Sequence, residues 1–205
     1  MVEVLKHPLI THKLTQMRSV ETEPESFRRY LKDISSLMIY EVCKDLPTKE
    51  VSVVTPKGIC STEELSKSIV VVPILRAGIG FVDGILDVLP EAKVGFVGLY
   101  RDEDSLDPQV YYSKFPDMED EVVIIVDPTL ATGSSAIEAA NMIKRKGAKD
   151  IKMMCLVAAP EGIKALEEAH PDIDIYAAAL DDRLDENGYI IPGLGDVGDR
   201  LYGTK

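Results

Sequence analysis

The sequence has few cysteines, and its basic residues are outnumbered by acidic ones. Cys43, Cys60 and Cys155 are the three cysteines among 205 residues, and no two of them form a Cys-x-x-Cys pair. This number and spacing favour neither a disulfide framework nor a zinc site. Lysine and arginine number 23 against 35 acidic residues, which gives a net charge of −12. Because a nucleic-acid backbone is bound by a basic surface, we expect no nucleic-acid partner.

Long apolar runs are also missing. No stretch of the chain approaches the roughly 18 apolar residues that a membrane-spanning helix requires. The first residues lack the basic start and apolar centre of a signal peptide. We therefore expect no membrane association and a cytoplasmic location. The composition, 45% apolar and 28% charged, is typical of a globular protein, and the length fits one domain over residues 1–205.

Residues 122–136, VVIIVDPTLATGSSA, predict a strand, a turn and a helix. The unbroken apolar run from Val122 to Val126 is typical of a strand buried on both faces of a parallel sheet. Asp127 closes this strand, and Pro128 prevents its extension because proline fixes φ and lacks an N–H donor. A small, hydroxyl-rich turn is expected from residue 129 to residue 135, and a helical pattern begins at residue 136.

This turn has the features of a phosphate-binding loop. Short side chains let backbone N–H groups approach a phosphate, and the N-terminus of the following helix supplies a positive dipole. Thr132, Ser134 and Ser135 add hydroxyl donors, and Asp127 could accept hydrogen bonds from the hydroxyls of a sugar. An ordinary tight turn before a capped helix has the same pattern. The loop is neither a Walker loop nor a Gly-x-Gly-x-x-Gly fingerprint.

Two further strand patterns are followed by arginine. Residues 68–73, SIVVVP, predict a buried strand that leads to Arg76, and residues 94–100 predict another that leads to Arg101. Ligands of open parallel sheets bind at the carboxyl edge of the strands. A structural ion pair would explain Arg76 alone equally well. Two arginines at the same edge as the predicted phosphate loop favour an anionic ligand.

The alternation of strands and helices predicts an α/β fold, with a mostly parallel sheet flanked by helices. Residues 49–68 interrupt it with two strands around a Pro-Lys-Gly turn, which predicts a hairpin arm. Residues 102–118 are polar and long for a connection, so we expect a lid loop with a short strand at residues 110–112. His7 and His12 have no partnering acid or cysteine and are interpreted as surface or capping residues.

The tail, residues 181–205, predicts an ordered segment that binds a ligand. Its glycines, at positions 188, 193, 195, 198 and 203, indicate tight turns and close backbone approach. A frayed terminus is the ordinary expectation for a chain end. Here apolar residues such as Tyr189, Ile190 and Leu194 alternate with the glycines, unlike a solvated tail. We therefore expect a loop that wraps a ligand through its backbone groups.

Three motifs together resemble a known family. GYIIPGLGDVGDR, VDPTLATGSSA and VVPILRAG are similar to motifs of the uracil phosphoribosyltransferase family, and the similarity runs from KHPLITHKLTQMR to the final LYGTK. The resemblance implies the type I phosphoribosyltransferase fold with a hairpin arm and a C-terminal base-binding hood. It implies transfer of ribose 5-phosphate from 5-phosphoribosyl pyrophosphate (PRPP) to N1 of uracil, giving UMP and pyrophosphate with Mg²⁺. A homodimer or larger homo-oligomer and activation by GTP are further expectations.

The resemblance also assigns roles to single residues. Arg76 and Arg101 match arginines that contact the pyrophosphate, and we expect Arg101 and Asp196 to be catalytic, with Asp196 also binding PRPP. Mg²⁺ is expected to be held mainly by substrate and water. The residues expected to hold the phosphate and ribose of PRPP are Asp127, Pro128, Thr129, Leu130, Ala131, Thr132, Gly133, Ser134 and Ser135. The residues expected to recognise uracil, largely through the main chain, are Tyr189, Ile190, Gly195, Asp196 and Val197.

Three positions depart from the usual family pattern. Thr129 stands where Met is common, Ser134 where Gly is common, and Val197 where Ala is usual. A residue with a Cβ at position 134 would be strained if the loop needs a positive φ there, and Val197 adds bulk beside the base pocket. Two other functions stay open, namely transfer to a different base and nucleotide sensing by a regulatory protein on the same fold.

Overall fold

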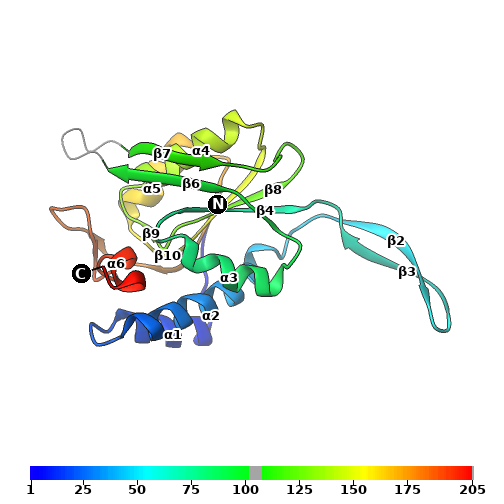
Figure 1. Cartoon of the computed structure of the whole chain (residues 1–205), viewed down its shortest axis with the longest axis horizontal. Helices are drawn as coiled ribbons and strands as arrows, with labels where there is room; N and C mark the ends of the chain where they lie inside the picture. Colours follow the sequence, from blue (N-terminus) through cyan, green and yellow to red (C-terminus); the bar gives the residue numbers. More distant parts are fainter. Residues whose placement is uncertain (102–107, 205) are drawn as a thin grey trace.

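A mostly parallel sheet forms the centre of the molecule (Figure 1). The computed structural model describes residues 1–101 and 108–204. The strands of this sheet are β1 (Val2–Val4), β4 (Ile69–Leu75), β5 (Lys93–Val94), β6 (Phe96–Arg101), β7 (Pro108–Lys114), β8 (Val122–Val126), β9 (Thr129–Leu130), β10 (Asp150–Ala158) and β11 (Asp174–Leu180). Their order is β1-β11-β10-β8-β4-β6-β7, with β5 paired to β4 and β9 paired to β10. The predicted α/β fold is confirmed.

The continuous apolar runs belong to strands that are covered on both faces. In β8, Val122, Ile124 and Val126 contribute to one buried cluster, whereas Val123 and Ile125 contribute to another. The strands β4 and β10 divide their side chains between the same two clusters. Because alternate side chains of a strand point to opposite faces of the sheet, a layer of helices on each face buries the whole run.

Helices form those two layers. One cluster takes side chains from α1 (Pro8–Arg18), α2 (Pro24–Val42), α3 (Ile79–Val88) and α6 (Val197–Tyr202), and the other from α4 (Ser134–Arg145) and α5 (Pro160–Ala169). Figure 1 shows α1, α2 and α3 on one side of the sheet and α4 and α5 on the other. Among the described helices, none has both the length and the apolar character needed to cross a membrane.

The two histidines near the N-terminus have the ordinary roles that the sequence suggested. Nδ1 of His7 accepts a hydrogen bond from the backbone N–H of Leu9 at 3.2 Å, at the start of α1. Such a cap satisfies an N–H group that has no partner inside the helix. His12 is exposed on the same helix. The interpretation of these residues as capping and surface residues is confirmed.

A hairpin extends from the body of the molecule (Figure 1). It consists of β2 (Thr48–Thr55) and β3 (Gly58–Leu65), which pair antiparallel from Thr48 opposite Leu65 to Thr55 opposite Gly58. No residue of either strand is buried, and Val54 and Ile59 are 87% and 80% exposed. The hairpin is therefore held together by its hydrogen-bonded ladder and its turn and has no core of its own.

The strands β6 and β7 form an antiparallel edge of the sheet. Gly98 pairs with Tyr112 and Leu99 with Val110, with a register shift between them. The strand expected at residues 110–112 is confirmed, and it is longer than expected, spanning Pro108–Lys114. Residues 102–107 of the predicted lid loop lie outside the described residues, so the lid itself stays a prediction.

Candidate active site

The candidate site lies at the carboxyl edge of the parallel strands. The strands β4 and β8 are neighbours, and the helices that follow them, α3 and α4, pack on opposite faces of the sheet. A ligand crevice forms at such a point because the two connections diverge from each other. The fold therefore brings the segment after β4 and the segment after β8 to one place.

A cavity of about 400 Å³ opens at this edge. Its size falls in the range of small-molecule sites. One wall comes from the segments after β4 and β8, with Arg76, Ala77, Thr129 and Ala131. The other wall comes from the tail, with Asn187, Gly188, Tyr189, Ile190, Leu194, Gly195, Asp196, Val197 and Gly198. The structure thus brings all five residues that the sequence assigned to uracil into one cavity wall.

A second cavity of about 150 Å³ lies beside the first, at the N-terminus of α4. The residues that line it are Asp127, Thr129, Leu130, Ala131, Thr132, Gly133, Ser135 and Ala136. Thr129 and Ala131 line both cavities, so the two spaces are adjacent. Of the nine residues predicted to hold the phosphate and ribose of PRPP, Pro128 and Ser134 line neither cavity.

The loop after β8 is shorter than the sequence predicted. Thr129 and Leu130 form the short strand β9 beside β10, and the helix α4 already begins at Ser134. Asp127 and Pro128 interrupt the strand without ending it, because β10 continues past the end of β8. The backbone N–H groups of Leu156 and Val157 in β10 donate to the carbonyl of Pro128 at 3.0 and 3.1 Å.

The positive φ of the loop falls at Gly133 and not at Ser134. Gly133 has a φ of 84°, in the left-handed region that favours glycine, whereas Ser134 is the first helical residue. The concern that Ser134 needs a positive φ was therefore wrong. The Oγ atoms of Ser134 and Thr132 lie 3.2 Å apart, and the N–H of Ser134 donates to Oγ1 of Thr132 at 3.4 Å.

Two glycines that the sequence analysis did not assign to the site allow the loops to pack closely together. A Cβ at Gly162 in α5 would lie 2.4 Å from the carbonyl oxygen of Ala131, and one at Gly78 would lie 2.5 Å from that of Val126. Real Cβ atoms do not approach so closely, so any larger residue would displace the loop. The glycines in PEGI and RAGI were the available sequence signal, but their neighbours could not be foreseen.

Asp127 has an altered acidity. Burial raises the pKa of its carboxyl from the usual 3.8 to about 7, while a hydrogen bond from the backbone of Thr129 acts in the opposite direction. The residue still lines the smaller cavity, where a ligand can reach it. Near neutral pH the side chain is therefore divided between its protonated and ionised forms.

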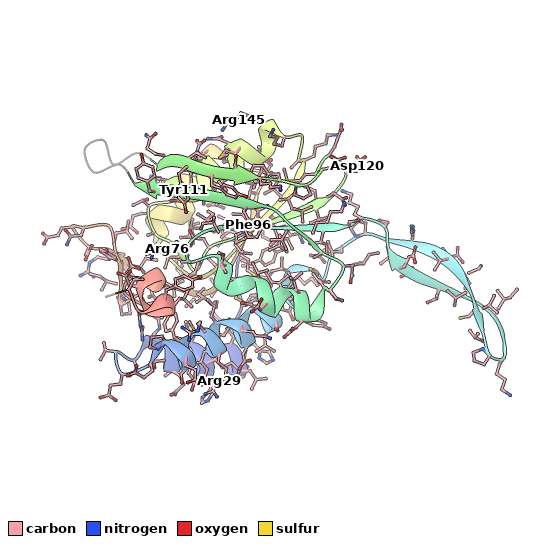
Figure 2. All side chains as sticks on the ribbon, in the orientation of Figure 1. Arg29, Arg76, Phe96, Tyr111, Asp120 and Arg145 are labelled. Carbon is pink, nitrogen blue, oxygen red and sulfur yellow. The ribbon has the colours of Figure 1, made fainter. Side chains whose placement is uncertain are left out.

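Arg76 lies where α6 meets the sheet (Figure 2). Its side chain is 57% exposed, and Nη2 is 3.5 Å from Oδ1 of Asp199. The hydroxyl of Tyr202 donates to the carbonyl oxygen of Arg76 at 3.2 Å. The structural ion pair considered for Arg76 is thus present, but an exposed pair contributes little stability. Arg76 also lines the larger cavity, so the same guanidinium is placed both to pair with Asp199 and to contact a ligand.

Asp196 is the N-cap residue of α6. Its Oδ1 accepts a hydrogen bond from the backbone N–H of Asp199 at 2.9 Å. A Cβ at Gly198 would lie 3.3 Å from Oδ1 of Asp196 and 3.5 Å from Nη2 of Arg76. The glycine therefore leaves a small space that the carboxylate and the guanidinium share. Asp199 was not foreseen as a partner of either residue.

Arg101 is the last residue of β6, beside β4 in the sheet. Its side chain lies outside the described part of the structure. The backbone position is at the carboxyl edge where the other predicted residues gather. The role of Arg101 in pyrophosphate binding and catalysis stays a prediction.

The carboxylates that line the two cavities are Asp127 and Asp196. Within the described residues there is no cluster of three or more His, Cys, Asp or Glu side chains suited to a metal ion. Mg²⁺ takes oxygen ligands, is commonly bound by one or two carboxylates plus substrate phosphates, and keeps several waters. This donor set fits a Mg²⁺ ion that arrives with a phosphorylated ligand.

A family model of uracil phosphoribosyltransferase matches residues 4–204. The chain belongs to the uracil phosphoribosyltransferase family. Two relatives bearing this name, from Dictyoglomus thermophilum and Ligilactobacillus salivarius, are 58% and 57% identical to it. The first match covers 100% of both chains, and the second covers 99% of this chain and 98% of the relative.

Solved structures confirm the fold of this family member. The AQ2163 protein from Aquifex aeolicus matches with a TM-score of 0.96 and 42% identity, over 100% of this chain and 99% of that chain. A purine phosphoribosyltransferase from Pyrococcus horikoshii matches with a TM-score of 0.52 and 18% identity, over 77% of this chain and 91% of that chain. At 18% identity the second likeness shows the fold alone, and it confirms the type I phosphoribosyltransferase fold.

Proposed function

We propose that the chain transfers ribose 5-phosphate from PRPP to N1 of uracil, giving UMP and pyrophosphate in pyrimidine salvage. The observation that carries this proposal is the adjacency of two cavities that share Thr129 and Ala131. The smaller cavity, at the N-terminus of α4, suits a phosphate group. The larger cavity, lined by the glycine-rich tail, suits a flat base. Membership of the family supports the same activity.

The loop after β8 would bind the phosphate and ribose of PRPP. The first N–H groups of a helix have no partner within it, and those of α4 begin beside Gly133 at the smaller cavity. The side chains of Thr132 and Ser135 would add hydroxyl donors, and Asp127 would accept hydrogen bonds from ribose hydroxyls. The side chain of Leu130 is buried, so only its backbone could contribute.

Uracil would bind against residues 189–197. Ile190 and Val197 are 8% and 4% exposed and offer an apolar wall to the ring. Backbone groups around Gly195 would pair with the donors and acceptors on its edge. A base with a different pattern would leave buried polar groups unpaired, and this cost would favour uracil. The exposed Tyr189 would flank the entrance.

The reaction itself requires alignment more than a strong nucleophile. The bond from C1′ to a pyrophosphate oxygen breaks, the bond from C1′ to N1 of uracil forms, and the proton of N1 passes to water or to the departing pyrophosphate. Arg76 and Arg101 would stabilise the departing pyrophosphate, and Asp196 would face the positive charge that develops on the ribose. Mg²⁺, held by the pyrophosphate, water and at most the carboxylates of Asp127 and Asp196, would add charge neutralisation.

The raised pKa of Asp127 predicts a pH dependence. We expect kcat/KM for PRPP to increase as pH rises through about 7, because the ionised carboxylate accepts hydrogen bonds from the ribose hydroxyls better than the acid does. The same shift lowers the free energy of unfolding as pH rises from about 4 to about 7, since the folded protein holds the proton longer. Initial rates at limiting PRPP between pH 6 and pH 8.5 measure the first effect.

The matched variant for this measurement is Asp127→Asn. The phosphate of PRPP also titrates, with a pKa of about 6, so part of the pH profile belongs to the substrate. Asn keeps the size of the side chain but cannot titrate, and the step near pH 7 should disappear from its profile. Superimposable profiles for the wild type and the variant would show that Asp127 does not act in this way.

The proposed function is tested by an assay of nucleotide formation from PRPP and Mg²⁺. The acceptors are uracil, cytosine, hypoxanthine, guanine, adenine and orotate. Formation of UMP with uracil alone is the expected result, and it would show that Thr129, Ser134 and Val197 are compatible with the activity. Formation of a nucleotide with another base would mean that the acceptor of the reaction is that base and not uracil. Binding of PRPP without any product would favour a nucleotide-sensing protein.

Assembly and regulation stay predictions of the family resemblance. The exposed apolar side chains of the hairpin β2–β3, such as Val54 and Ile59, support a homodimer or larger homo-oligomer. Activation by GTP is expected from the resemblance. Light scattering, and the UMP assay with and without GTP, measure the two properties separately.

A further inference from the structure

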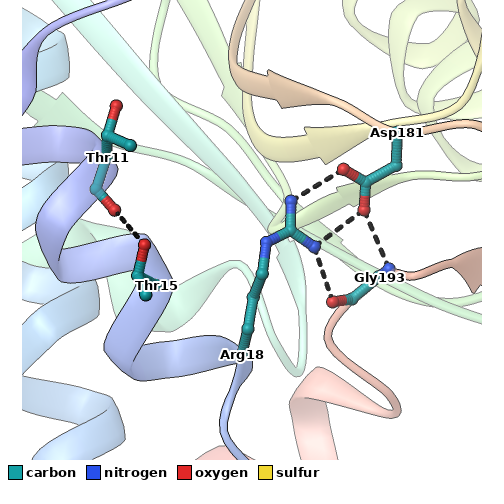
Figure 3. A network of polar contacts seen from close by, with 5 residues as sticks. All are labelled: Thr11, Thr15, Arg18, Asp181 and Gly193. Atoms are coloured by element: carbon teal, nitrogen blue, oxygen red, sulfur yellow. Dashed lines mark hydrogen bonds and ion pairs between the residues drawn. The ribbon is translucent and has the colours of Figure 1, made fainter.

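An ion pair that connects the N-terminal part of the chain with the tail lies against the backbone of Gly193 (Figure 3). Arg18 is the last residue of α1, and Asp181 directly follows β11. Nη2 of Arg18 donates to Oδ1 of Asp181 at 2.7 Å, and Nη1 donates to Oδ2 at 2.8 Å. The side chain of Asp181 is 6% exposed, and that of Arg18 is 27% exposed. A bidentate ion pair of this kind fixes the relative orientation of the two side chains as well as their distance.

The same pair holds the backbone of Gly193 on both sides. Nη1 of Arg18 donates to the carbonyl oxygen of Gly193 at 2.8 Å, and the N–H of Gly193 donates to Oδ2 of Asp181 at 2.8 Å (Figure 3). Gly193 has a φ of 60°, and a Cβ there would lie 2.1 Å from the carbonyl oxygen of Ile190. The pair therefore binds the turn between Ile190 and Gly195, both of which line the larger cavity.

Arg18 and Asp181, to which this turn is attached, lie on well-packed parts of the fold. Ile10, Leu14 and Met17 bury α1 in the core, and the N–H of Asp181 donates to the carbonyl oxygen of Ala158 at the end of β10. The turn has two further attachments, since the side chain of Leu194 is buried in the core and its carbonyl oxygen accepts a hydrogen bond from Nη1 of Arg200 at 3.1 Å. Leu194, Gly195 and Asp196 line the 400 Å³ cavity of the candidate site on one side and a third cavity, of about 540 Å³, on the other. Open space on both sides leaves the position of residues 194–196 dependent on their attachments.

We infer that Arg18 and Asp181 are positioning residues. From outside the cavity they fix the position of the backbone that recognises uracil, and so they determine the affinity for the base. The inference rests on the proposed function and deepens it. Neither side chain lines the larger cavity. Their effect would pass through Gly193, whose position sets where the backbone groups of residues 194–196 face the base. Recognition by backbone groups requires a fixed loop, because a shift of about 1 Å weakens hydrogen bonds and alignment.

Three variants test the inference by steady-state kinetics. Arg18→Lys keeps the positive charge but cannot form the bidentate pair. Asp181→Asn removes the negative charge of the buried partner. The double variant Arg18→Gln with Asp181→Asn removes both charges, so no buried charge is left unpaired. We expect KM for uracil to rise by about tenfold in each, with KM for PRPP changed by less than about twofold, because PRPP is bound by other loops. The double variant should raise KM for uracil no further than Asp181→Asn does alone, because the two residues act together.

The matched control is Asp33→Asn. Asp33 of α2 pairs with Lys13, which lies on α1 as Arg18 does, at 2.6 Å, and within the described residues this pair forms no hydrogen bond or ion pair with the tail. Its loss should leave both KM values unchanged. A uracil KM within twofold of the wild type in the folded variants would overturn the inference, and so would equal rises in both KM values. Loss of folded protein in all three variants would also overturn it, because the pair would then serve the fold as a whole.

Amide hydrogen exchange separates this inference from the proposed function. Exchange at residues 193–196 should become about tenfold faster in Arg18→Lys, while exchange in α5 stays unchanged, because the attachment of the turn is weakened locally. Absence of UMP formation by the wild type would overturn the proposed function, and unchanged exchange would then overturn the inference as well. Wild-type activity with unchanged uracil KM in folded variants would overturn the inference alone.

Discussion

Replacing Asp196 by Asn is expected to lower kcat for UMP formation by about 100-fold or more, because the proposed function places this charge against the transition state. In the structure Asp196 lines the larger cavity and caps α6 through the N–H of Asp199. Asn caps a helix about as well as Asp, so the fold should be kept. The measurement pairs the initial rate at saturating uracil and PRPP with the thermal midpoint of unfolding.

Asp182→Asn is the control for this substitution. Asp182 is an exposed residue of the same tail, and the change in charge is the same. It should leave both the rate and the thermal midpoint unchanged. Asp196→Ala should lose about 1 kcal/mol of stability in addition to the activity, because alanine cannot cap the helix. Parallel losses of stability and rate in Asp196→Asn would assign the residue to the fold alone.

Replacing Arg76 by Gln is expected to lower kcat/KM for PRPP by about 100-fold, because in the proposed function this guanidinium stabilises the departing pyrophosphate. The effect on folding should be small. The pair between Arg76 and Asp199 is 3.5 Å long and the arginine side chain is 57% exposed, so the pair contributes little to the free energy of unfolding. Kinetics with PRPP as the varied substrate, together with a chemical denaturation curve, measure both quantities.

Arg145→Gln provides the comparison. Arg145 is also an exposed arginine in an ion pair, with Nη2 at 3.0 Å from Oε1 of Glu138, and it lies on α4 away from the cavities (Figure 2). Its replacement should change kcat/KM by less than about twofold, as expected for a surface pair. If Arg76→Gln behaved like Arg145→Gln, the assignment of Arg76 to the pyrophosphate would have to be abandoned.

Much of the site could be predicted because its residues are contiguous in sequence. The run from Val122 to Val126 predicted a buried strand, and Asp127 and Gly133 predicted a loop before a helix. These features follow from local rules of apolar patterning and backbone conformation. The error at Thr129 came from tertiary structure, since β10 is long enough to continue pairing past the end of β8.

Other features could not be read from local sequence. The contacts of Arg18 with Asp181 and of Arg76 with Asp199 join residues that are far apart in the chain. The glycine at 162 had no visible partner until α5 was packed against the loop. Side chains of this kind carry no local signal, because any surface arginine, aspartate or glycine has the same appearance in a sequence.

By itself the sequence determined the fold class, the segments expected to bind ligands and the family to which the chain belongs. Alternating apolar patterns, small-residue turns and three ordered motifs were sufficient, because each is a property of a short stretch. The tertiary structure alone decided which residues share a cavity wall, where the strand after Asp127 resumes, and what supports the turn at Gly193. Those outcomes depend on strand order and register, which bring the ends of the chain together only after folding.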